Sequence, residues 1–104
     1  MALEPVPLNL RVAPDARSRI VRFVASIDRP DAVATLMFDT NKRWSIGAYY
    51  RENIDGLTPE YEKNGWPLLH SCDGLTLAIP QWNLVPILEG RTLDFAVGDG
   101  YVIV

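Results

Sequence analysis

The sequence has very little cysteine: its 104 residues include one, Cys72. A single cysteine cannot close an internal disulfide, so nothing predicts a disulfide-stapled secreted domain. The sequence also lacks an apolar run approaching the roughly 20 residues of a membrane span. Its start shows no basic segment followed by an apolar stretch, the pattern of a signal peptide. These absences predict a cytoplasmic protein without a membrane partner.

Basic residues are not in excess either. Ten Lys and Arg stand against 13 Asp and Glu, which gives a formal net charge of −3 and a pI near 5.0. Proteins that bind nucleic acids need a basic face to displace counterions from phosphates, so we expect no nucleic-acid partner. The length predicts one domain over residues 1–104, which can bury a modest core without disulfides or metal.

The spacing of apolar residues predicts one helix near the start of the chain. Ala13-Pro14-Asp15 supplies residues suited to a helix start. Asp28-Arg29-Pro30 ends the helix, because proline disfavours helical geometry in the residue before it. The apolar residues at helical spacing are Ala16, Ile20, Val21, Phe23, Val24 and Ile27. We expect them to form the buried face of an amphipathic helix.

Short apolar or β-branched segments predict the strands. They lie at residues 8–12, 32–38, 44–50, 66–71, 75–79, 92–97 and 101–104. Asp55-Gly56 and Asn64-Gly65 are turn dipeptides that bound a polar connection over residues 57–63, and residues 81–88 favour a short helix or a turn. The expected fold class is α+β and mostly β: a small domain of short, largely antiparallel strands with one N-terminal amphipathic helix.

Two C-terminal segments carry a family resemblance. Asp73-Gly74-Leu75-Thr76-Leu77-Ala78-Ile79-Pro80 is followed by Leu88-Glu89-Gly90-Arg91-Thr92-Leu93-Asp94-Phe95. This order resembles the C-terminal half of the HesB/IscA-like (A-type) iron–sulfur carriers. Residues 10–16 and 34–50 are similar to the family's opening strand and helix and to its central hairpin. The resemblance implies the HesB/IscA-like fold, with Gly90, Leu93 and Asp94 as structural residues. We expect Gly90 in a tight turn at positive φ and Asp94 as an acceptor of backbone hydrogen bonds.

The same resemblance argues against cluster carriage. The family's carriers hold iron or a cluster through three cysteines, one in the turn of the central hairpin and two in a Cys–Gly–Cys tail after the last strand. Here the corresponding turn is Asp39-Thr40-Asn41-Lys42-Arg43, the sequence stops at Val104, and Cys72 falls at none of the three places. Soft iron and cluster sites need thiolates. We therefore expect no cofactor.

His70-Ser71-Cys72-Asp73 is the stretch with the most reactive side chains. On a strand, His70 and Cys72 point to the same face, which makes them candidate metal ligands. A structural zinc site takes four ligands, so a second subunit would have to complete it. As a nucleophile and its base, the pair would need an orienting group and an oxyanion hole. The structural interpretation, which we favour, makes Asp73-Gly74 a hairpin turn, Cys72 a small semi-buried residue and His70 a polar strand residue.

Aromatic residues concentrate in the middle of the chain and form a second candidate site. Trp44, Ile46 and Ala48 alternate on one face of their strand, and Tyr49 lies on the other. Trp and Tyr are enriched at protein interfaces, although tryptophans also fill the cores of small domains. The candidate binding surface consists of Trp44, Tyr49, Tyr50 and Trp66.

Three functions remain open. The first is a non-enzymatic binding or assembly module with a HesB/IscA-like fold, which acts on a protein partner or by self-association. The second is an iron–sulfur or metal accessory protein that uses Cys72 and His70 at a dimer interface. The third is a small cysteine-dependent enzyme. We favour the first, which requires neither catalytic residues nor a cofactor, and an exposed edge strand would allow a homodimer.

Overall fold

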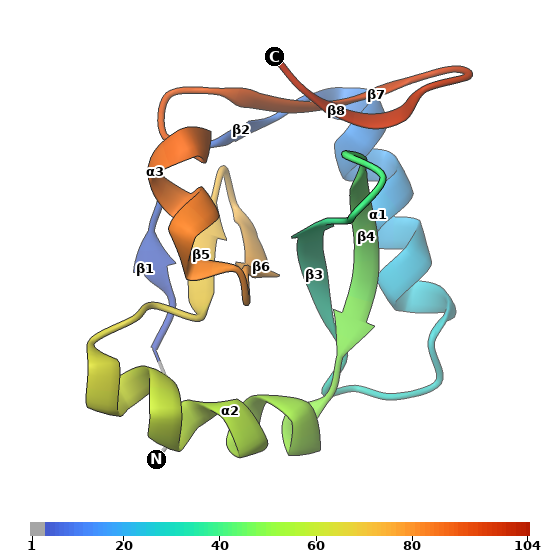
Figure 1. The fold of residues 1–104 in the computed structure, drawn as a ribbon. Helices are drawn as coiled ribbons and strands as arrows, with labels where there is room; N and C mark the ends of the chain where they lie inside the picture. The colour runs from blue at the N-terminus through green and yellow to red at the C-terminus, as the bar shows by residue number, and fades with distance from the viewer. Residues whose placement is uncertain (1–3) are drawn as a thin grey trace.

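The computed structural model describes residues 4–104 and consists of one mixed eight-stranded sheet with three helices (Figure 1). The strands are β1 (Val6–Pro7), β2 (Arg11–Val12), β3 (Val33–Phe38), β4 (Trp44–Tyr49), β5 (Leu69–Cys72), β6 (Leu75–Ala78), β7 (Thr92–Ala96) and β8 (Gly100–Ile103). The helices are α1 (Pro14–Ser26), α2 (Arg51–Asn64) and α3 (Val85–Leu88), with a single 3-10 turn, η1 (Trp82–Leu84), before the last.

The sheet has the order β1-β5-β6-β3-β4-β8-β7-β2. Three of its pairings are parallel (β1 with β5, β2 with β7, β3 with β6) and four are antiparallel. The expectation of largely antiparallel strands is therefore too simple, because local hairpins say nothing about pairings between distant segments. The two predicted hairpins, β3 with β4 and β5 with β6, are both present, and β7 also pairs with β8.

Helix α1 begins and ends where the sequence predicts. Pro14 lies in its first turn, and Ile27 ends it in extended geometry. Ala16 and Ile20 are buried, but Val21 and Phe23 are 49% and 37% exposed. The predicted buried face was therefore too wide: it included residues on a side of α1 that the sheet does not cover.

Helix α2 replaces the polar connection predicted over residues 57–63. Tyr50 and Asn53 form a capping box at its start, and Gly65 ends it in the left-handed region at φ 69°. Its buried residues are Ile54, Thr58 and Tyr61, at spacings of four and three. Asp55-Gly56 indicated a turn, but Gly56 is tolerated on the exposed side of the helix, as is Pro59.

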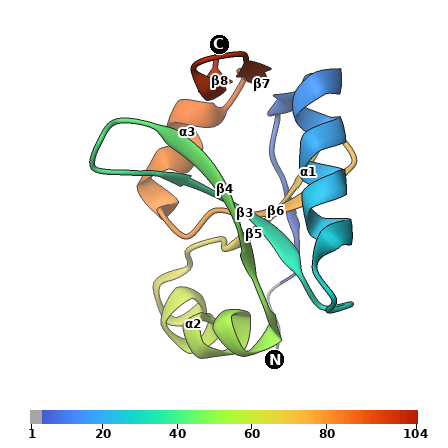
Figure 2. The same cartoon turned by 90° about the vertical axis from the view of Figure 1, so that its right-hand side faces the viewer.

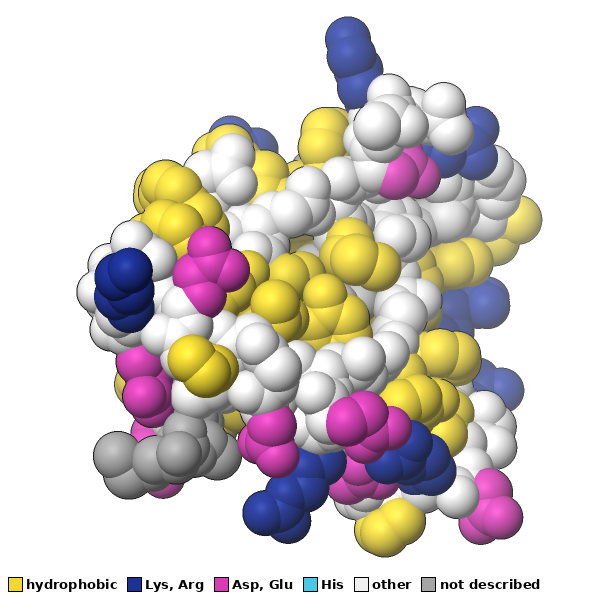
Figure 3. All heavy atoms as spheres, turned by 60° about the horizontal axis from the view of Figure 1, so that its bottom comes forward, with side chains coloured by type: hydrophobic (Ala, Val, Ile, Leu, Met, Phe, Trp, Pro, Cys, Tyr) yellow, Lys and Arg dark blue, Asp and Glu magenta, His cyan; other side chains and the backbone are white. Residues whose placement is uncertain are grey.

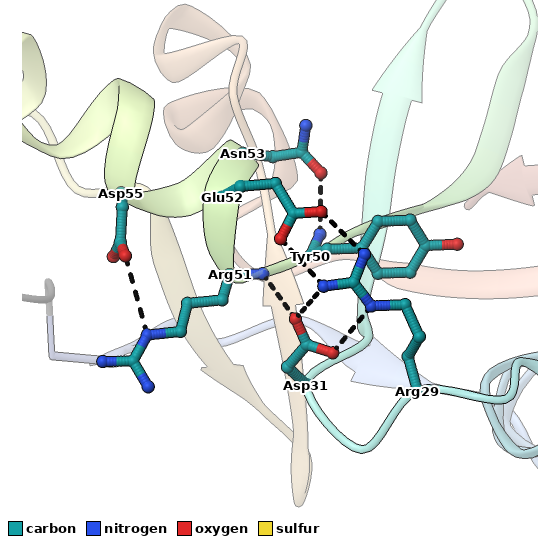
Figure 4. A network of polar contacts seen from close by, with 7 residues as sticks. All are labelled: Arg29, Asp31, Tyr50, Arg51, Glu52, Asn53 and Asp55. Carbon is teal, nitrogen blue, oxygen red and sulfur yellow. Dashed lines mark hydrogen bonds and ion pairs between the residues drawn. The ribbon is translucent and has the colours of Figure 1, made fainter.

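An arginine joins the segment after α1 to the start of α2 (Figure 4). The Arg29 guanidinium donates to both carboxylate oxygens of Asp31 and to both of Glu52, at 2.6–3.0 Å. Asp31 also accepts the Arg51 amide at 2.8 Å. The Arg29 guanidinium lies 4.1 Å from the centre of the Tyr50 ring. This network, together with the capping box, sets where α2 starts.

The buried apolar residues form two clusters. The larger joins residues of α1, the sheet and α3, and it includes Leu10, Ile20, Leu36, Leu77 and Leu93. The smaller lies against α2 and includes Ile54, Tyr61, Leu68, Leu69 and Ala78. Figure 2 shows α1 and α3 on opposite sides of the central strands.

The residues expected to be structural behave as expected. Gly90 has φ 80°, a value that favours glycine. Asp94 accepts the Phe95 amide at 2.7 Å, and Leu93 is fully buried. The Asp73-Gly74 turn joins β5 to β6 with positive φ at both residues.

Candidate functional site

Strand β5 carries His70 and Cys72 on one face. The intervening Ser71 is exposed, and the preceding Leu69 packs in the cluster against α2. His70 and Cys72 therefore share the face of β5 opposite Leu69, and Cys72 belongs to the larger cluster. Cys72 is 0% exposed and His70 is 1% exposed. The sequence placed the two side chains on one face correctly, but they lie in the core.

The chemistry of both groups is set by burial. Burial raises the pKa of the Cys72 thiol to about 12, and the nearby carboxylates of Asp73 and Glu89 act in the same direction. Burial also lowers the pKa of His70 below its usual range, with the Pro67 carbonyl acting in the opposite sense. A protonated thiol is a poor nucleophile and a poor metal ligand.

The Pro67 carbonyl lies close enough to His70 to favour its protonated form, but within residues 4–104 no group makes a hydrogen bond of normal geometry to either ring nitrogen. A catalytic base is normally oriented by such a hydrogen bond, and so is a metal-bound imidazole. Within residues 4–104, no group of three or more His, Cys, Asp or Glu side chains could hold a metal ion. The pair therefore has neither the companions nor the access that a metal or nucleophilic site requires.

The turn between β3 and β4 is built from oxygen and nitrogen groups. The Asp39 carboxylate accepts the amides of Asn41 at 2.9 Å and Arg43 at 3.0 Å, and Lys42 adopts φ 60°. Beside this turn lies an open depression of about 350 Å³, whose lining includes Lys42, Arg43, Trp44, Asp99 and Tyr101. Asp39 is thus used to close the turn, and cationic side chains flank it.

The predicted aromatic surface is not one surface. Trp44 contacts Phe38 with ring centres 4.8 Å apart and packs against the larger cluster. Tyr49 and Trp66 pack against the smaller cluster on the other side of the sheet. Tyr50 lies beneath Arg29. The structure therefore does not bring Trp44, Tyr49, Tyr50 and Trp66 together, because α2 covers the face that Tyr49 was expected to expose.

A different aromatic group forms where α2, β5 and η1 meet. The rings of Trp66 and Trp82 stack with centres 4.7 Å apart, and Tyr61 meets Trp66 edge-on at 5.6 Å. The Tyr61 hydroxyl donates to the Pro80 carbonyl. An open depression of about 380 Å³ adjoins this group and is lined by Val6, Pro67 and the carboxylates of Glu4 and Glu62, among others. The helical spacing of Ile54 and Tyr61 is the sequence signal for α2, the helix that brings Tyr61 to this group.

The surface charges are mixed. On the face shown in Figure 3, Lys and Arg side chains lie among Asp and Glu side chains around an apolar centre, so this face carries no continuous basic patch. No helix of the described residues is long and apolar enough to cross a membrane.

Comparison with known proteins identifies the fold. No protein-family model matches the sequence, and no curated protein matches it. The crystal structure of Escherichia coli SufA, a protein involved in biosynthesis of iron–sulfur clusters, matches 92% of this chain and 82% of its own, with a TM-score of 0.53 at 20% sequence identity. The chain has the HesB/IscA-like fold.

The HesB/IscA-like fold makes the β3–β4 turn the position to examine for a cluster ligand. The sequence resemblance aligns this turn with the family's first ligand cysteine, and here it holds Asp39, Lys42 and Arg43 instead. A thiolate-bound cluster does not fit this set, because Asp39 already accepts two backbone amides and the other two side chains are cations. Cys72 lies on β5, in the core.

Proposed function

We propose that this chain is a cytoplasmic, non-enzymatic binding or assembly module, related to iron–sulfur assembly, that does not hold a cluster through cysteine. The observation that carries the proposal is the combination of a HesB/IscA-like fold with a β3–β4 turn closed by Asp39 and flanked by Lys42 and Arg43. The fold supports a place near iron–sulfur chemistry, and the turn argues against cluster ligation there.

The two alternatives both depend on Cys72. A metal accessory protein would need Cys72 and His70 at a subunit interface, yet both side chains are buried in the core. A cysteine-dependent enzyme would need a thiolate, whereas burial raises the pKa of this thiol to about 12. The geometry therefore supports the binding module best.

Anaerobic reconstitution tests the proposal. The purified chain is incubated with ferrous iron, sulfide and a thiol reductant, desalted, and examined by its optical spectrum and by elemental analysis for iron and zinc. The Cys72→Ser variant is treated in parallel. We expect both proteins to be colourless and equally poor in metal. Near-stoichiometric iron in the wild type that is lost in the variant would contradict the proposal and favour the metal accessory function.

A further inference from the structure

The outer edge of β4 has backbone groups that no other strand uses. The Asp39 amide donates to the Arg43 carbonyl at 2.9 Å, so these two residues form a hydrogen-bonded pair of the β3–β4 ladder. Such pairs alternate along an antiparallel ladder, and the backbone groups of Trp44, Ile46 and Ala48 therefore point away from β3. Trp44 is covered, since it pairs with Tyr101 of β8. Within residues 4–104, no second strand pairs with β4 at Ile46 or Ala48 on its outer side.

Proline removes the corresponding outward amides on β1. The Leu8 amide donates to the Ser71 carbonyl of β5 at 3.0 Å, so residue 8 faces inward. By alternation, the outward positions of this edge strand are Pro5 and Pro7, which have no N–H to offer. Proline on an edge strand is a common protection against pairing with other chains.

Side chains occupy the outward amides at three further places. The Val12 amide on β2 donates to the Asp73 carboxylate at 3.1 Å. The Tyr50 amide, just after β4, donates to the Asn53 side chain at 2.8 Å. The Gln81 side chain accepts the Phe38 amide at 2.8 Å and donates to the Phe38 carbonyl at 2.9 Å. By contrast, no protein group of the described chain takes up the amides and carbonyls of Ile46 and Ala48.

Helix α1 extends past the β4 edge of the sheet, over the position that an added strand would occupy. In Figure 1 it stands behind the sheet and reaches past β4, and Figure 2 shows it on one side of β4. Phe23 lies one turn beyond Arg19, whose guanidinium sits 3.8 Å from the centre of the Phe95 ring, so both share the side of α1 toward β7 and β8. This side of α1 is partly open, and Phe23 is 37% exposed.

The same side of α1 is cationic. Arg19, Arg22 and Phe23 line an open depression of about 370 Å³. Arg19 is paired with Asp15 at 3.4 Å. Arg22 donates to the Ser18 hydroxyl at 3.1 Å and has no carboxylate within 4 Å in residues 4–104. Arg22 is therefore a cation without a counterion in the described residues, on the helix that reaches past the β4 edge.

We propose that the β4 edge at Ile46 and Ala48 is a docking site for an extended, acidic segment of a partner protein, which adds a strand to the sheet beneath α1. This inference rests on the proposed function and says where a partner binds. A second copy of the chain fits less well. Antiparallel pairing of two β4 edges imposes a two-fold axis, and the two α1 helices, each reaching past its own edge on the same face, would then compete for the same space.

The test uses a defined peptide as its probe. It is a capped, fluorescent peptide of about six residues in which glutamate alternates with valine, the length of an ordinary strand. Binding is measured by anisotropy, and the contact residues are mapped by amide chemical shifts and hydrogen exchange. We expect shifts and added protection at the Ile46 and Ala48 amides. Peptides N-methylated on one or the other alternate set of amides should differ, with only one set abolishing binding, because an added strand bonds through one side.

Charge is tested by matched variants. Arg22→Glu should weaken binding roughly five- to tenfold, since it replaces attraction by repulsion beside the docked strand. Arg91→Glu, an exposed arginine outside the depression, should leave it within about twofold. A peptide with lysine in place of glutamate should bind more weakly to the wild type.

Three results would overturn the inference: no binding of the glutamate peptide, binding that is indifferent to N-methylation, or protection of Ile46 and Ala48 that instead grows with protein concentration alone. The last would assign the edge to a second copy. Reconstitution with iron is an independent readout. A colourless protein that does not bind the peptide would refute the strand site and leave the proposed function standing, whereas cluster formation through Cys72 would refute the proposed function.

Discussion

At the scale of single residues, the most unusual group is the imidazole of His70. It is 1% exposed, and neither ring nitrogen makes a hydrogen bond of normal geometry in the described residues. A buried polar group without a hydrogen bond costs about 1–3 kcal/mol. The effects of burying and of protonating this imidazole on the free energy of unfolding can therefore both be measured at one residue.

We expect stability to fall as the pH drops below about 6.5. Burial lowers the pKa of His70 in the fold, whereas in the unfolded chain it titrates near 6.5. At pH values between the folded and unfolded pKa of His70, the unfolded chain binds a proton that the folded chain does not. The free energy of unfolding therefore falls on acidification. Urea unfolding at pH 7.5 and 5.5 measures the change.

His70→Leu serves as the control for that titration. It should raise stability at neutral pH by about 1 kcal/mol, because it removes two unpaired nitrogens from an apolar site. Its advantage over the wild type should widen at pH 5.5. A gap that stays constant between the two pH values would show that His70 is not buried in its neutral form.

At the scale of elements, α1 shows what the spacing of apolar residues can predict about a buried face and what it cannot. Ile20→Ala should destabilise the protein by about 2–5 kcal/mol, since Ile20 is 2% exposed. Phe23→Ala should cost clearly less, because Phe23 is 37% exposed. Equal losses in chemical denaturation would mean that the buried face of α1 is misassigned.

The Arg29 network makes a separate prediction about α2. Arg29 holds the pKa of Glu52 below its usual range, and the Arg51 amide, followed by Arg29, does the same for Asp31. We expect Arg29→Gln to speed amide exchange in the first turn of α2, and acidification through the carboxylate range to do likewise in the wild type. Arg51→Gln, which loses only an exposed pair with Asp55 at 3.6 Å, should have little effect. Similar exchange in both variants would count against the network.

These elements also show why prediction from the sequence was uneven. The β3–β4 and β5–β6 hairpins were foreseen because alternation and turn residues are local signals. Helix α2 was missed because the dipeptides Asp55-Gly56 and Asn64-Gly65 indicated turns. The buried positions Ile54, Thr58 and Tyr61 mix an apolar, a hydroxyl and an aromatic residue, so their helical spacing was hard to see. The parallel pairings of β1, β2 and β3 leave no local signal at all.

At the scale of the whole molecule, burial in the core explains why the predicted candidate residues do not form accessible sites. The sequence placed His70 and Cys72 on one face, but nothing in it showed that this face would lie in the core. The aromatic surface failed for the same reason, since α2 takes up Tyr49 and Trp66. What was anticipated was the fold itself, through a C-terminal segment whose turn at Gly90 and hydrogen bond at Asp94 are both present.

Cys72 is a core residue, and the alkylation rate of its thiol tests this most directly. Iodoacetamide is added to the native protein at several pH values and urea concentrations, with the unfolded protein as reference. Because burial raises the thiol pKa to about 12, we expect native alkylation to be slow, to accelerate with urea alongside unfolding, and to show no inflection near neutral pH. Rapid native alkylation with an inflection near pH 7 would instead reveal an accessible thiolate and contradict the account.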